Sequence, residues 1–348
     1  MIQEDQIREQ LGKVNYPGFS RDIISFGLVK GIEIADSGDV VVKLSLATRD
    51  PKVPKTIHEE TMAALSSIDG IGKVTIDFDI KEPAQPEGGA STSSGQSAIP
   101  GVKKIIAVAS GKGGVGKSTV ATNLAIALQK GGAKVGLCDC DLYGPSVAMM
   151  LGIGDENPMA TEQNEIIPID AHGIKAISMG NLISDDSAVI VRGPLATRYI
   201  QQFLRQCRWA DDVELDYLIL DLPPGTGDIQ LTIVQTVALD GAIIVTTPQE
   251  VALIDARKAI SMFKKVNVGI SGMIENMAWF ECDHGTRYPI FGEGGGKAEA
   301  KKIGVPLLGQ IPIDPLTGKR ADEGTPVALL DPAENAISAA FAEIAKQV

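Results

Sequence analysis

The stretch Gly111-Lys112-Gly113-Gly114-Val115-Gly116-Lys117-Ser118 decides the fold of this chain of 348 residues. It has the spacing Gly-x-x-x-x-Gly-Lys-Ser/Thr, in which backbone N–H groups converge on phosphate oxygens. The apolar residues 105–109 before it predict a strand, and residues 118–130 after it predict a helix that ends at a Gly-Gly pair. A glycine-rich turn between a strand and a helix N-terminus indicates a pocket for the phosphates of a nucleotide.

Each residue type in this loop, a P-loop, has a chemical task. Lys117 is predicted to reach the β- and γ-phosphates and to act in catalysis, and Ser118 is predicted to bind Mg²⁺. The residues expected to contact ATP here are Gly111, Lys112, Gly113, Gly114, Val115, Gly116, Lys117, Ser118 and Thr119. The alternative is a glycine-rich turn without a ligand, which the flanking strand and helix disfavour.

Two acidic stretches follow predicted strands and complete the expected site. Asp221 ends an apolar strand and precedes Pro223-Pro224-Gly225, so it is predicted to hold Mg²⁺. Asp141, in Asp139-Cys140-Asp141, is predicted to orient the attacking water as a catalytic residue. For either carboxylate the alternative is a cap or turn aspartate. Gly225 is a candidate switch position beside the γ-phosphate.

The rest of the large unit alternates strands with helical stretches. Further apolar strands are expected at residues 135–138, 217–222, 242–246, 268–275 and 307–311. Continuous apolar strands separated by helices predict an α/β fold whose mostly parallel sheet is covered by helices on both faces, a P-loop NTPase. Ligands bind beyond the carboxyl ends of such strands, where the motifs above lie.

A stretch rich in Pro, Gly and Ser separates this unit from a smaller one. We expect a small α+β domain at residues 1–82, a flexible linker at 83–101 and the ATPase domain at 102–348. Within the small domain, helices are expected at residues 3–14 and 55–68. Strands are expected there at residues 23–36, 40–48 and 74–80.

Composition limits the partners and the compartment. The formal net charge of −12 disfavours nucleic acid, and the chain shows no basic patch that would override it. The N-terminus lacks the apolar stretch of a signal peptide, and no apolar run approaches the ~20 residues that span a bilayer. We therefore expect a cytoplasmic protein that binds neither nucleic acid nor membranes, with its four cysteines free or bound to metal.

Lys112, directly after the first loop glycine, adds a specific signal. Its position resembles the deviant Walker A class of ATPases, in which the early lysine crosses a dimer interface to the partner's nucleotide. The resemblance implies a homodimer and a catalytic role for Lys112; the alternative is a solvated loop lysine. It also implies that Asn276, expected at a strand end, contacts adenine, and that Asp314 lies near the base. A turn-forming Asn is the alternative at position 276.

Several stretches together resemble the Mrp-type iron–sulfur cluster carrier ATPases. The matching residues are 111–119, 139–146, 192–194, 221–228, 272–277, 290–296 and 308–314, with 26–29, 48–51 and 77–78 in the small domain. The small domain is similar to the iron–sulfur assembly domain fused to many bacterial members. The resemblance implies a homodimer that hydrolyses ATP slowly. It also implies that a labile cluster, [4Fe–4S] in type, passes to apo iron–sulfur proteins, with cluster assembly factors as further partners.

The cysteines depart from that family's pattern. A Cys-x-x-Cys pair is expected after the Asn-Met stretch, but this chain has Cys282-Asp283-His284-Gly285, so Cys282 alone is the candidate iron–sulfur ligand. Two subunits would then supply two thiolates, fewer than the four that a [4Fe–4S] cluster takes. His284, a Cys from elsewhere or an external thiol would have to complete the ligand set. The alternative for Cys282 is a structural or free thiol, and His284 is expected to be an ordinary surface-loop residue. Cys138 and Cys140 are expected to be small core residues, and Cys207 an ordinary helix residue.

Two other functions share the same loop. One is a positioning ATPase of the chromosome-partition or septum-placement kind, which needs a DNA-binding surface or a C-terminal amphipathic membrane helix; residues 333–348 are rich in Ala and poor in basic residues. The other is a nucleotide-gated scaffold that does not turn over ATP. The cluster-carrier hypothesis is preferred because of the family resemblance.

Overall fold

The computed structural model divides into two compact units, Met1–Ser91 and Thr92–Val348. It describes residues 4–14, 22–24, 28–35, 37–47, 52–66, 68, 70–81, 98–142, 144–161, 165–181, 200, 203–210 and 213–348. Residues 83–97 of the predicted linker and the stretch Arg192-Gly193-Pro194 lie outside the described residues. The two units are therefore described separately.

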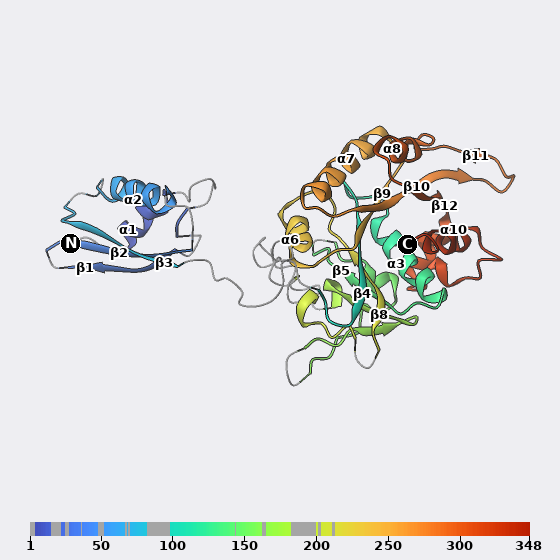
Figure 1. The fold of residues 1–348 in the computed structure, drawn as a ribbon, viewed down its shortest axis with the longest axis horizontal. Helices are drawn as coiled ribbons and strands as arrows, with labels where there is room; N and C mark the ends of the chain where they lie inside the picture. The colour runs from blue at the N-terminus through green and yellow to red at the C-terminus, as the bar shows by residue number, and fades with distance from the viewer. Residues whose placement is uncertain are drawn as a thin grey trace. The chain divides into compact units, whose positions relative to one another are not determined.

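The small unit is a three-stranded sheet with two helices. Its elements are α1 (Glu4–Leu11), β1 (Val29–Ile34), β2 (Val40–Ala47), α2 (Lys52–Leu65) and β3 (Val74–Lys81). The strand order is β1-β2-β3, with β1 antiparallel and β3 parallel to β2 (Figure 1). Apolar side chains such as Leu11, Leu44 and Ile57 form a core of its own.

One strand of the small unit begins later than predicted. β1 starts at Val29 rather than at residue 23, because the Asp22 carboxylate accepts the Ile24 N–H and the chain turns there. The Asp side chain thereby offers the backbone an alternative to strand pairing.

The large unit alternates strands and helices around one sheet. Its strands are β4 (Val102–Ala109), β5 (Val135–Asp139), β6 (Ile169–Ala171), β7 (Ile174–Ser178), β8 (Leu215–Asp221), β9 (Gly241–Thr246), β10 (Ile270–Glu281), β11 (Arg287–Tyr288) and β12 (Leu307–Ile313). Its helices are α3 (Lys117–Lys130), α4 (Val147–Met150), η1 (Met179–Asn181), α6 (Asp228–Thr236), α7 (Glu250–Lys265), α8 (Gly295–Ile303), α9 (Pro315–Asp322), η3 (Val327–Leu329) and α10 (Ala336–Ala345).

The sheet of the large unit is mostly parallel, as predicted. Its order is β11-β10-β9-β4-β8-β5-β7-β6, with β12 beside β10. The pairs made by β4, β5, β8, β9 and β12 are parallel, whereas β6 and β11 run antiparallel to their neighbours. The short antiparallel strands lie at the two ends of the order, where the parallel pattern stops.

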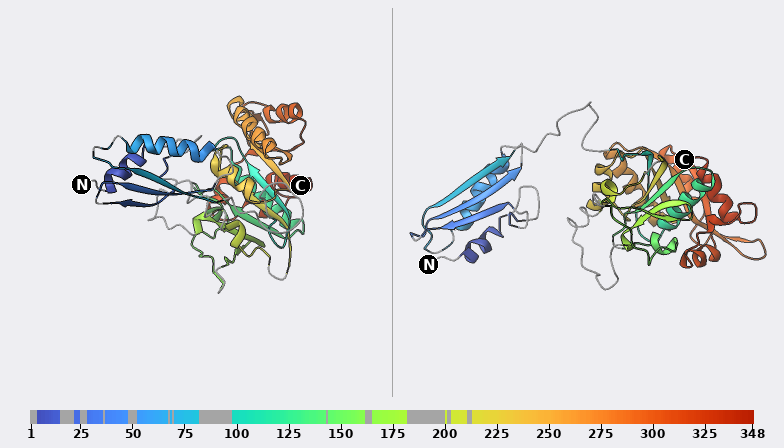
Figure 2. Two further views of the ribbon diagram at one scale, coloured as in Figure 1. Left: turned by 60° about the vertical axis from the view of Figure 1, so that its left-hand side comes forward. Right: turned by 90° about the horizontal axis from the view of Figure 1, so that it is seen from below.

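Helices cover both faces of this sheet, which gives it two cores. On one face α3 and α10 pack against side chains such as Val108 and Ile219. On the other face α6, α7 and α8 pack against neighbours such as Ala107 and Leu220 (Figure 2). Burial on both faces explains why these strands are apolar at every position rather than at alternate ones. None of the helices among the described residues is both long enough and apolar enough to cross a bilayer.

β10 differs from its predicted limits. It was expected to end at residue 275 but extends to Glu281, so Asn276 lies within a strand rather than at its end. Pairing with β9 stops at Glu275, and pairing with β12 resumes at Phe280 after an irregularity. Met277, between these points, has a φ of 54°. The strand continues because β12 and β11 still provide partners beyond β9.

Candidate functional site

The P-loop connects β4 to α3, and two of its glycines are required by close neighbours. A Cβ on Gly111 would lie 2.0 Å from the carbonyl carbon of Asp255 in α7. Gly116 precedes α3 with a φ of +80°, and a Cβ there would lie 2.2 Å from Nδ2 of Asn276. Glycine is therefore needed at these two positions of the motif, because the backbone of α7 and a side chain of β10 lie against the loop.

The other two loop glycines face open space. A Cβ on Gly113 or Gly114 would have nothing within 4 Å, and Gly114 has a φ of +77°. Val115 is buried beneath the loop, whereas Ser118 and Thr119 are half-buried in the first turn of α3. Open space beside backbone amides at a helix N-terminus is what an anionic phosphate chain needs, so the loop fits a nucleotide.

The predicted catalytic lysine and magnesium ligand contact each other. Lys117 Nζ lies 2.6 Å from Oδ1 of Asp221 and 3.2 Å from the Ser118 hydroxyl, although 104 residues separate Lys117 from Asp221. The side chain of Lys117 is 6% exposed and that of Asp221 is not exposed. A buried ion pair of this kind leaves little freedom to either partner, so the ammonium must shift before it can contact a phosphate.

The second carboxylate oxygen of Asp221 supports the predicted cation site. Oδ2 of Asp221 is buried and has no hydrogen-bond partner within the described residues. Burial raises the pKa of Asp221, and the Lys117 ammonium and the Ser118 hydroxyl oppose that rise. A buried acceptor without a donor is costly, and an acceptor beside a phosphate loop is suited to a Mg²⁺ ion or its water.

Asp139 is a further residue of this site, to which the sequence motifs assign no role. It ends β5 directly opposite Asp221 of β8 and is completely buried. Its carboxylate accepts four hydrogen bonds, from the backbone N–H groups of Asp141, Ser146 and Val147 and from the Ser178 hydroxyl. Burial, followed by the charge of Asp221, raises the pKa of Asp139 to about 7, and these hydrogen bonds oppose the rise.

Asp141 lies in the same site as Asp221. It is 8% exposed, and its negative charge contributes to the raised pKa of Asp221. The preceding Cys140 N–H donates to the Asp221 carbonyl oxygen at 2.9 Å, which joins the two acidic stretches. The Gly225 N–H donates to the Ser110 carbonyl oxygen at 3.0 Å, so the predicted switch glycine also contacts the P-loop. The water-orienting role of Asp141 stays a prediction.

Lys112 is half-buried in the loop, where the Ser110 hydroxyl donates to its carbonyl oxygen at 2.9 Å. The role of its ammonium across a dimer interface stays a prediction.

The two predicted adenine-contacting residues have structural contacts of their own. Asn276 Nδ2 donates to the Val115 carbonyl oxygen at 2.8 Å, which attaches β10 to the P-loop. Asp314 caps α9, accepting from the backbone N–H groups of Leu316 and Thr317 and from the Thr317 hydroxyl. Asp314 thus has the contacts of a helix cap, and base contacts of either residue stay predictions.

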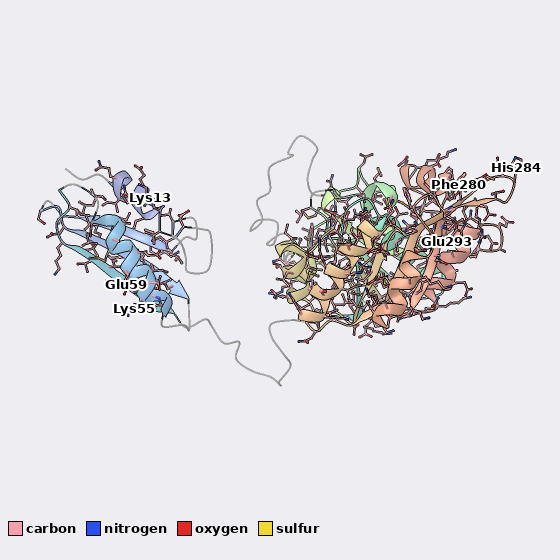
Figure 3. The ribbon with its side chains drawn as sticks, turned by 90° about the horizontal axis from the view of Figure 1, so that it is seen from above. Lys13, Lys55, Glu59, Phe280, His284 and Glu293 are labelled. Carbon is pink, nitrogen blue, oxygen red and sulfur yellow. The ribbon has the colours of Figure 1, made fainter. Side chains whose placement is uncertain are left out.

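Cys282 lies in the turn of the β10–β11 hairpin. Its N–H donates to the Thr286 carbonyl oxygen at 3.0 Å, and its carbonyl accepts from Gly285, which has a φ of +74°. Backbone N–H groups of His284 and Thr286 lower the pKa of the partly exposed Cys282 thiol. Across the hairpin, the guanidinium carbon of Arg287 lies 4.7 Å from the centroid of the Trp279 ring. Figure 3 shows His284 at the outer end of the hairpin.

Cys282 does not belong to a cluster of potential metal ligands among the described residues of its own chain. The described residues contain no group of three or more His, Cys, Asp or Glu side chains arranged to hold a metal ion. Cys138 and Cys140 are buried in the apolar core, as expected, with their sulfur atoms 3.7 Å apart. Cys207 is also buried there, but it follows the helical residues and forms an isolated bridge with Ile166 rather than lying in a helix. The hydrogen bond with Cys138, followed by burial, raises the pKa of Cys140 well above that of an ordinary thiol.

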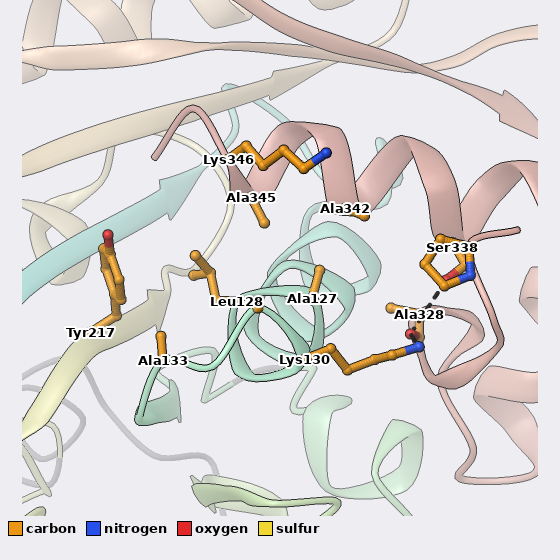
Figure 4. Close-up of a pocket in the computed structure, with 12 residues that line it drawn as sticks. Ala127, Leu128, Lys130, Ala133, Tyr217, Ala328, Ser338, Ala342, Ala345 and Lys346 are labelled. Atoms are coloured by element: carbon orange, nitrogen blue, oxygen red, sulfur yellow. Dashed lines mark hydrogen bonds between the residues drawn. The ribbon is translucent and has the colours of Figure 1, made fainter.

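A cavity of about 470 Å³ lies at the opposite end of α3, away from the P-loop (Figure 4). Its lining is mainly small and apolar, including Ala127, Ala342 and Ala345. Lys130 beside it donates to the carbonyl oxygens of Ala328, Leu329 and Leu330. These bonds attach the end of α3 to η3, so this lysine has a structural task.

Comparison with known proteins gives a consistent result for both units. A family model described as NUBPL iron-transfer P-loop NTPase matches residues 101–348, and one described as iron-sulfur cluster assembly protein matches residues 4–78. An iron-sulfur cluster carrier protein of Deinococcus radiodurans is 46% identical over 99% of this chain and 95% of its own length. An iron-sulfur cluster carrier protein of Synechocystis is 40% identical over 100% of this chain and 97% of its own length.

Solved structures resemble the large unit. A nucleotide-binding protein in complex with ADP from Archaeoglobus fulgidus is 38% identical, covers 65% of this chain and 88% of its own, and has a TM-score of 0.57. The septum site-determining protein MinD of Pyrococcus horikoshii, complexed with Mg-ADP, is 24% identical with a TM-score of 0.54, covering 70% of this chain and 95% of its own. The second likeness is one of fold alone.

Proposed function

Because this chain belongs to the family of NUBPL iron-transfer P-loop NTPases, we propose that it is an iron–sulfur cluster carrier that binds and slowly hydrolyses ATP. The observation that supports nucleotide binding is the Lys117–Asp221 pair beside an open glycine loop, with one buried Asp221 oxygen unpartnered. The iron-sulfur cluster assembly model that matches residues 4–78 and the cluster-carrier relatives support the cargo.

The proposed nucleotide site uses the chain's own groups as follows. The backbone of residues 111–119 encloses the phosphates, and Lys117 moves from Asp221 to the β- and γ-phosphates. Ser118 and Asp221 hold Mg²⁺, which would neutralise phosphate charge when bound. Asp141 orients the attacking water, while Asn276 and Asp314 lie toward the base.

We propose that the active form is a homodimer in which Lys112 reaches the partner's nucleotide. The exposed apolar residues around the P-loop support this proposal. Val251 and Ile254 in α7 are 62% and 45% exposed, and the adjoining Asp255 packs against Gly111. Ile290, 57% exposed, precedes a loop whose Gly292 and Gly295 approach Pro248 just before α7. Exposed apolar groups gathered on one part of the surface are typical of interfaces.

The proposed cargo is a labile cluster, [4Fe–4S] in type, held through Cys282 of each subunit. The lowered pKa of the Cys282 thiol and the position of Cys282 in an exposed hairpin turn favour a thiolate that accepts iron. Two such thiolates leave a [4Fe–4S] cluster short of ligands, so external thiols complete the set. Incomplete protein ligation suits a cluster that must be released to apo iron–sulfur proteins after delivery by assembly factors. The proposed compartment is the cytoplasm.

Anaerobic reconstitution with iron and sulfide tests the cargo. Wild-type protein is expected to gain charge-transfer absorbance and to pass iron and sulfide to an apo-acceptor, whereas Cys282→Ala is expected to lose most of both. His284→Ala, on the same exposed turn, is the matched control and should retain the cluster. Equal iron and sulfide in wild type and Cys282→Ala would remove Cys282 from the proposal, and none in wild type would remove the carrier function.

A further inference from the structure

We propose that Asp139 is a positioning residue for ATP hydrolysis, holding the loop that carries Asp141 in place over the phosphate end of the P-loop. The proposal rests on the hydrolysis proposed above and adds a residue to it. Asp139 would touch neither the nucleotide nor the attacking water, and would act through the loop alone.

The hydrogen bonds of Asp139 connect both ends of that loop to one carboxylate. At the start, Oδ1 accepts the Asp141 N–H at 3.0 Å. At the end, Oδ2 accepts the N–H groups of Ser146 and Val147, each at 3.1 Å. A single buried side chain therefore joins Asp141 to Ser146 and Val147 at the start of α4, as Asp side chains commonly do over shorter spans.

A neighbouring strand fixes the carboxylate itself. The Ser178 hydroxyl at the end of β7 donates to Oδ2 at 2.8 Å. The Ser178 oxygen also accepts the Gly180 N–H at 3.1 Å, and the Ser178 N–H donates to the Asn181 side chain at 3.2 Å. Since Asp139 is completely buried, these contacts are not exchanged with water and hold the side chain in one orientation.

The position of Asp139 explains why the loop matters for the phosphate end of the site. Asp139 and Asp221 are directly paired in the parallel register of β5 and β8. The chain after Asp139 therefore leaves the sheet beside the proposed magnesium ligand and brings Asp141 there. Both Asp139 oxygens already accept hydrogen bonds, and three of the four donors are backbone amides, so Asp139 is not suited to polarise a water itself.

The replacement Asp139→Asn tests the proposal in the full-length chain. An amide keeps the shape but has only one acceptor oxygen. Its NH₂ group therefore leaves either the Asp141 N–H or the donors from Ser146, Val147 and Ser178 without an acceptor, and one end of the loop is released. We expect kcat for ATP hydrolysis to fall by about tenfold to a hundredfold, because small displacements of a catalytic group have effects of that size. The Kd for ATP should change by less than about threefold, since the P-loop backbone is untouched.

Hydrogen exchange supplies a readout that does not depend on hydrolysis. The amides of Asp141, Ser146 and Val147 should exchange faster in Asp139→Asn, while amides of residues 111–119 should not change. Ser178→Ala removes one donor and keeps the carboxylate charge, so it should show a smaller effect in the same direction. Asp240→Asn is the matched control, because Asp240 accepts the Ile105 N–H on the same sheet but before β9 begins.

The outcomes separate this inference from the proposed function. If wild type hydrolyses no ATP, the proposed hydrolysis fails, and faster exchange at the three amides would still establish that Asp139 fixes the loop. Unchanged exchange in Asp139→Asn would overturn the inference. So would a fall in kcat matched by an equal loss of ATP affinity, or an Asp240→Asn protein impaired to the same extent.

Discussion

At the residue scale, the glycines of the P-loop differ in what surrounds them, and this difference can be measured. A Cβ on Gly111 would meet the backbone of Asp255 and Ala256, which cannot rotate away, whereas a Cβ on Gly113 would meet nothing within 4 Å. We predict that Gly111→Ala destabilises the large unit by about 1–3 kcal/mol and weakens ATP binding at least about tenfold. Urea unfolding and calorimetry with Mg-ATP would measure both.

Gly113→Ala is the control for that substitution. It adds the same methyl group to the same loop, so we expect nearly wild-type stability. Equal destabilisation by the two replacements would contradict the packing of the loop against α7.

Cys282 allows a second prediction at this scale, on thiol ionisation. Because backbone N–H groups lower its pKa, the rate of alkylation by iodoacetamide in cluster-free protein should reach half its maximum below pH 8.5, roughly the midpoint of an ordinary cysteine. Thr286→Pro removes one of these N–H groups and should raise the midpoint. Mass spectrometry of the modified peptide against pH would measure this shift.

Thr286→Val separates the backbone effect from the side-chain effect. It keeps the N–H and removes the hydroxyl, whose contribution to the lowered pKa is smaller, so its midpoint should lie close to that of wild type. A midpoint for Thr286→Pro no higher than that for Thr286→Val would argue against the backbone origin of the shift.

The sequence predicts these residues unequally well, for physical reasons. The loop residues follow from spacing alone, since glycines and a lysine at these positions have one main use. The Lys117–Asp221 contact could be expected only in outline, because it depends on β4 and β8 being neighbours in the sheet. The role of Asp139 was missed because four donors from different segments meet there, and only the register with Asp221 offered a signal.

At the element scale, strand limits were predictable where burial decides them and not where pairing does. β4, β5 and β8 are apolar runs, and their observed limits lie within a few residues of the predicted ones. β10 continues past Glu275 because β12 and β11 replace β9 as its partner, which composition does not reveal. The consequence is functional, since one strand carries both the Asn276 contact to the P-loop and the hairpin of Cys282.

The contact between α7 and α8 yields a prediction about pH. Arg257 in α7 contacts Glu299 in α8 at 2.6 Å and Glu250 in its own helix at 2.7 Å; the two carboxylate side chains are 4% and 66% exposed. We predict that Glu299→Gln costs about 1 kcal/mol at pH 7, because it removes a charge-assisted pair whose carboxylate is buried but whose guanidinium is 35% exposed to screening by solvent. Glu250→Gln, the matched control, should cost less than about 0.5 kcal/mol.

The sign of the pH dependence follows from the Glu299 pKa. Arg257 lowers that pKa, so the pair stabilises the folded state above the unfolded-state pKa of about 4.3 and is lost as the pH falls further. The difference in unfolding free energy between wild type and Glu299→Gln should therefore be constant from pH 7 to about pH 5 and shrink below it. Urea denaturation at several pH values measures it, and a difference that grows toward acid would contradict the assignment.

At the scale of the whole molecule, the chain consists of two units, each with its own apolar core or cores. The small unit buries residues such as Leu11, Leu44 and Ile57, and the large unit has a core on each face of its sheet. A unit with its own core can unfold on its own. The division between Ser91 and Thr92 falls inside the predicted linker at 83–101, a stretch too poor in apolar residues to join the two cores.

We therefore predict that the fragment Thr92–Val348 folds alone and binds ATP with a Kd within about threefold of the full-length value. Each nucleotide-site residue named above lies in that fragment, and the Archaeoglobus nucleotide-binding protein matches 65% of this chain with 88% of its own. Scanning calorimetry of the full chain should show two transitions, only one of which moves upward when Mg-ATP is added, because a ligand stabilises the unit that binds it. A single transition that responds to ATP as a whole, or a fragment that unfolds well below the nucleotide-sensitive transition, would mean that the small unit contributes to the fold of the large one.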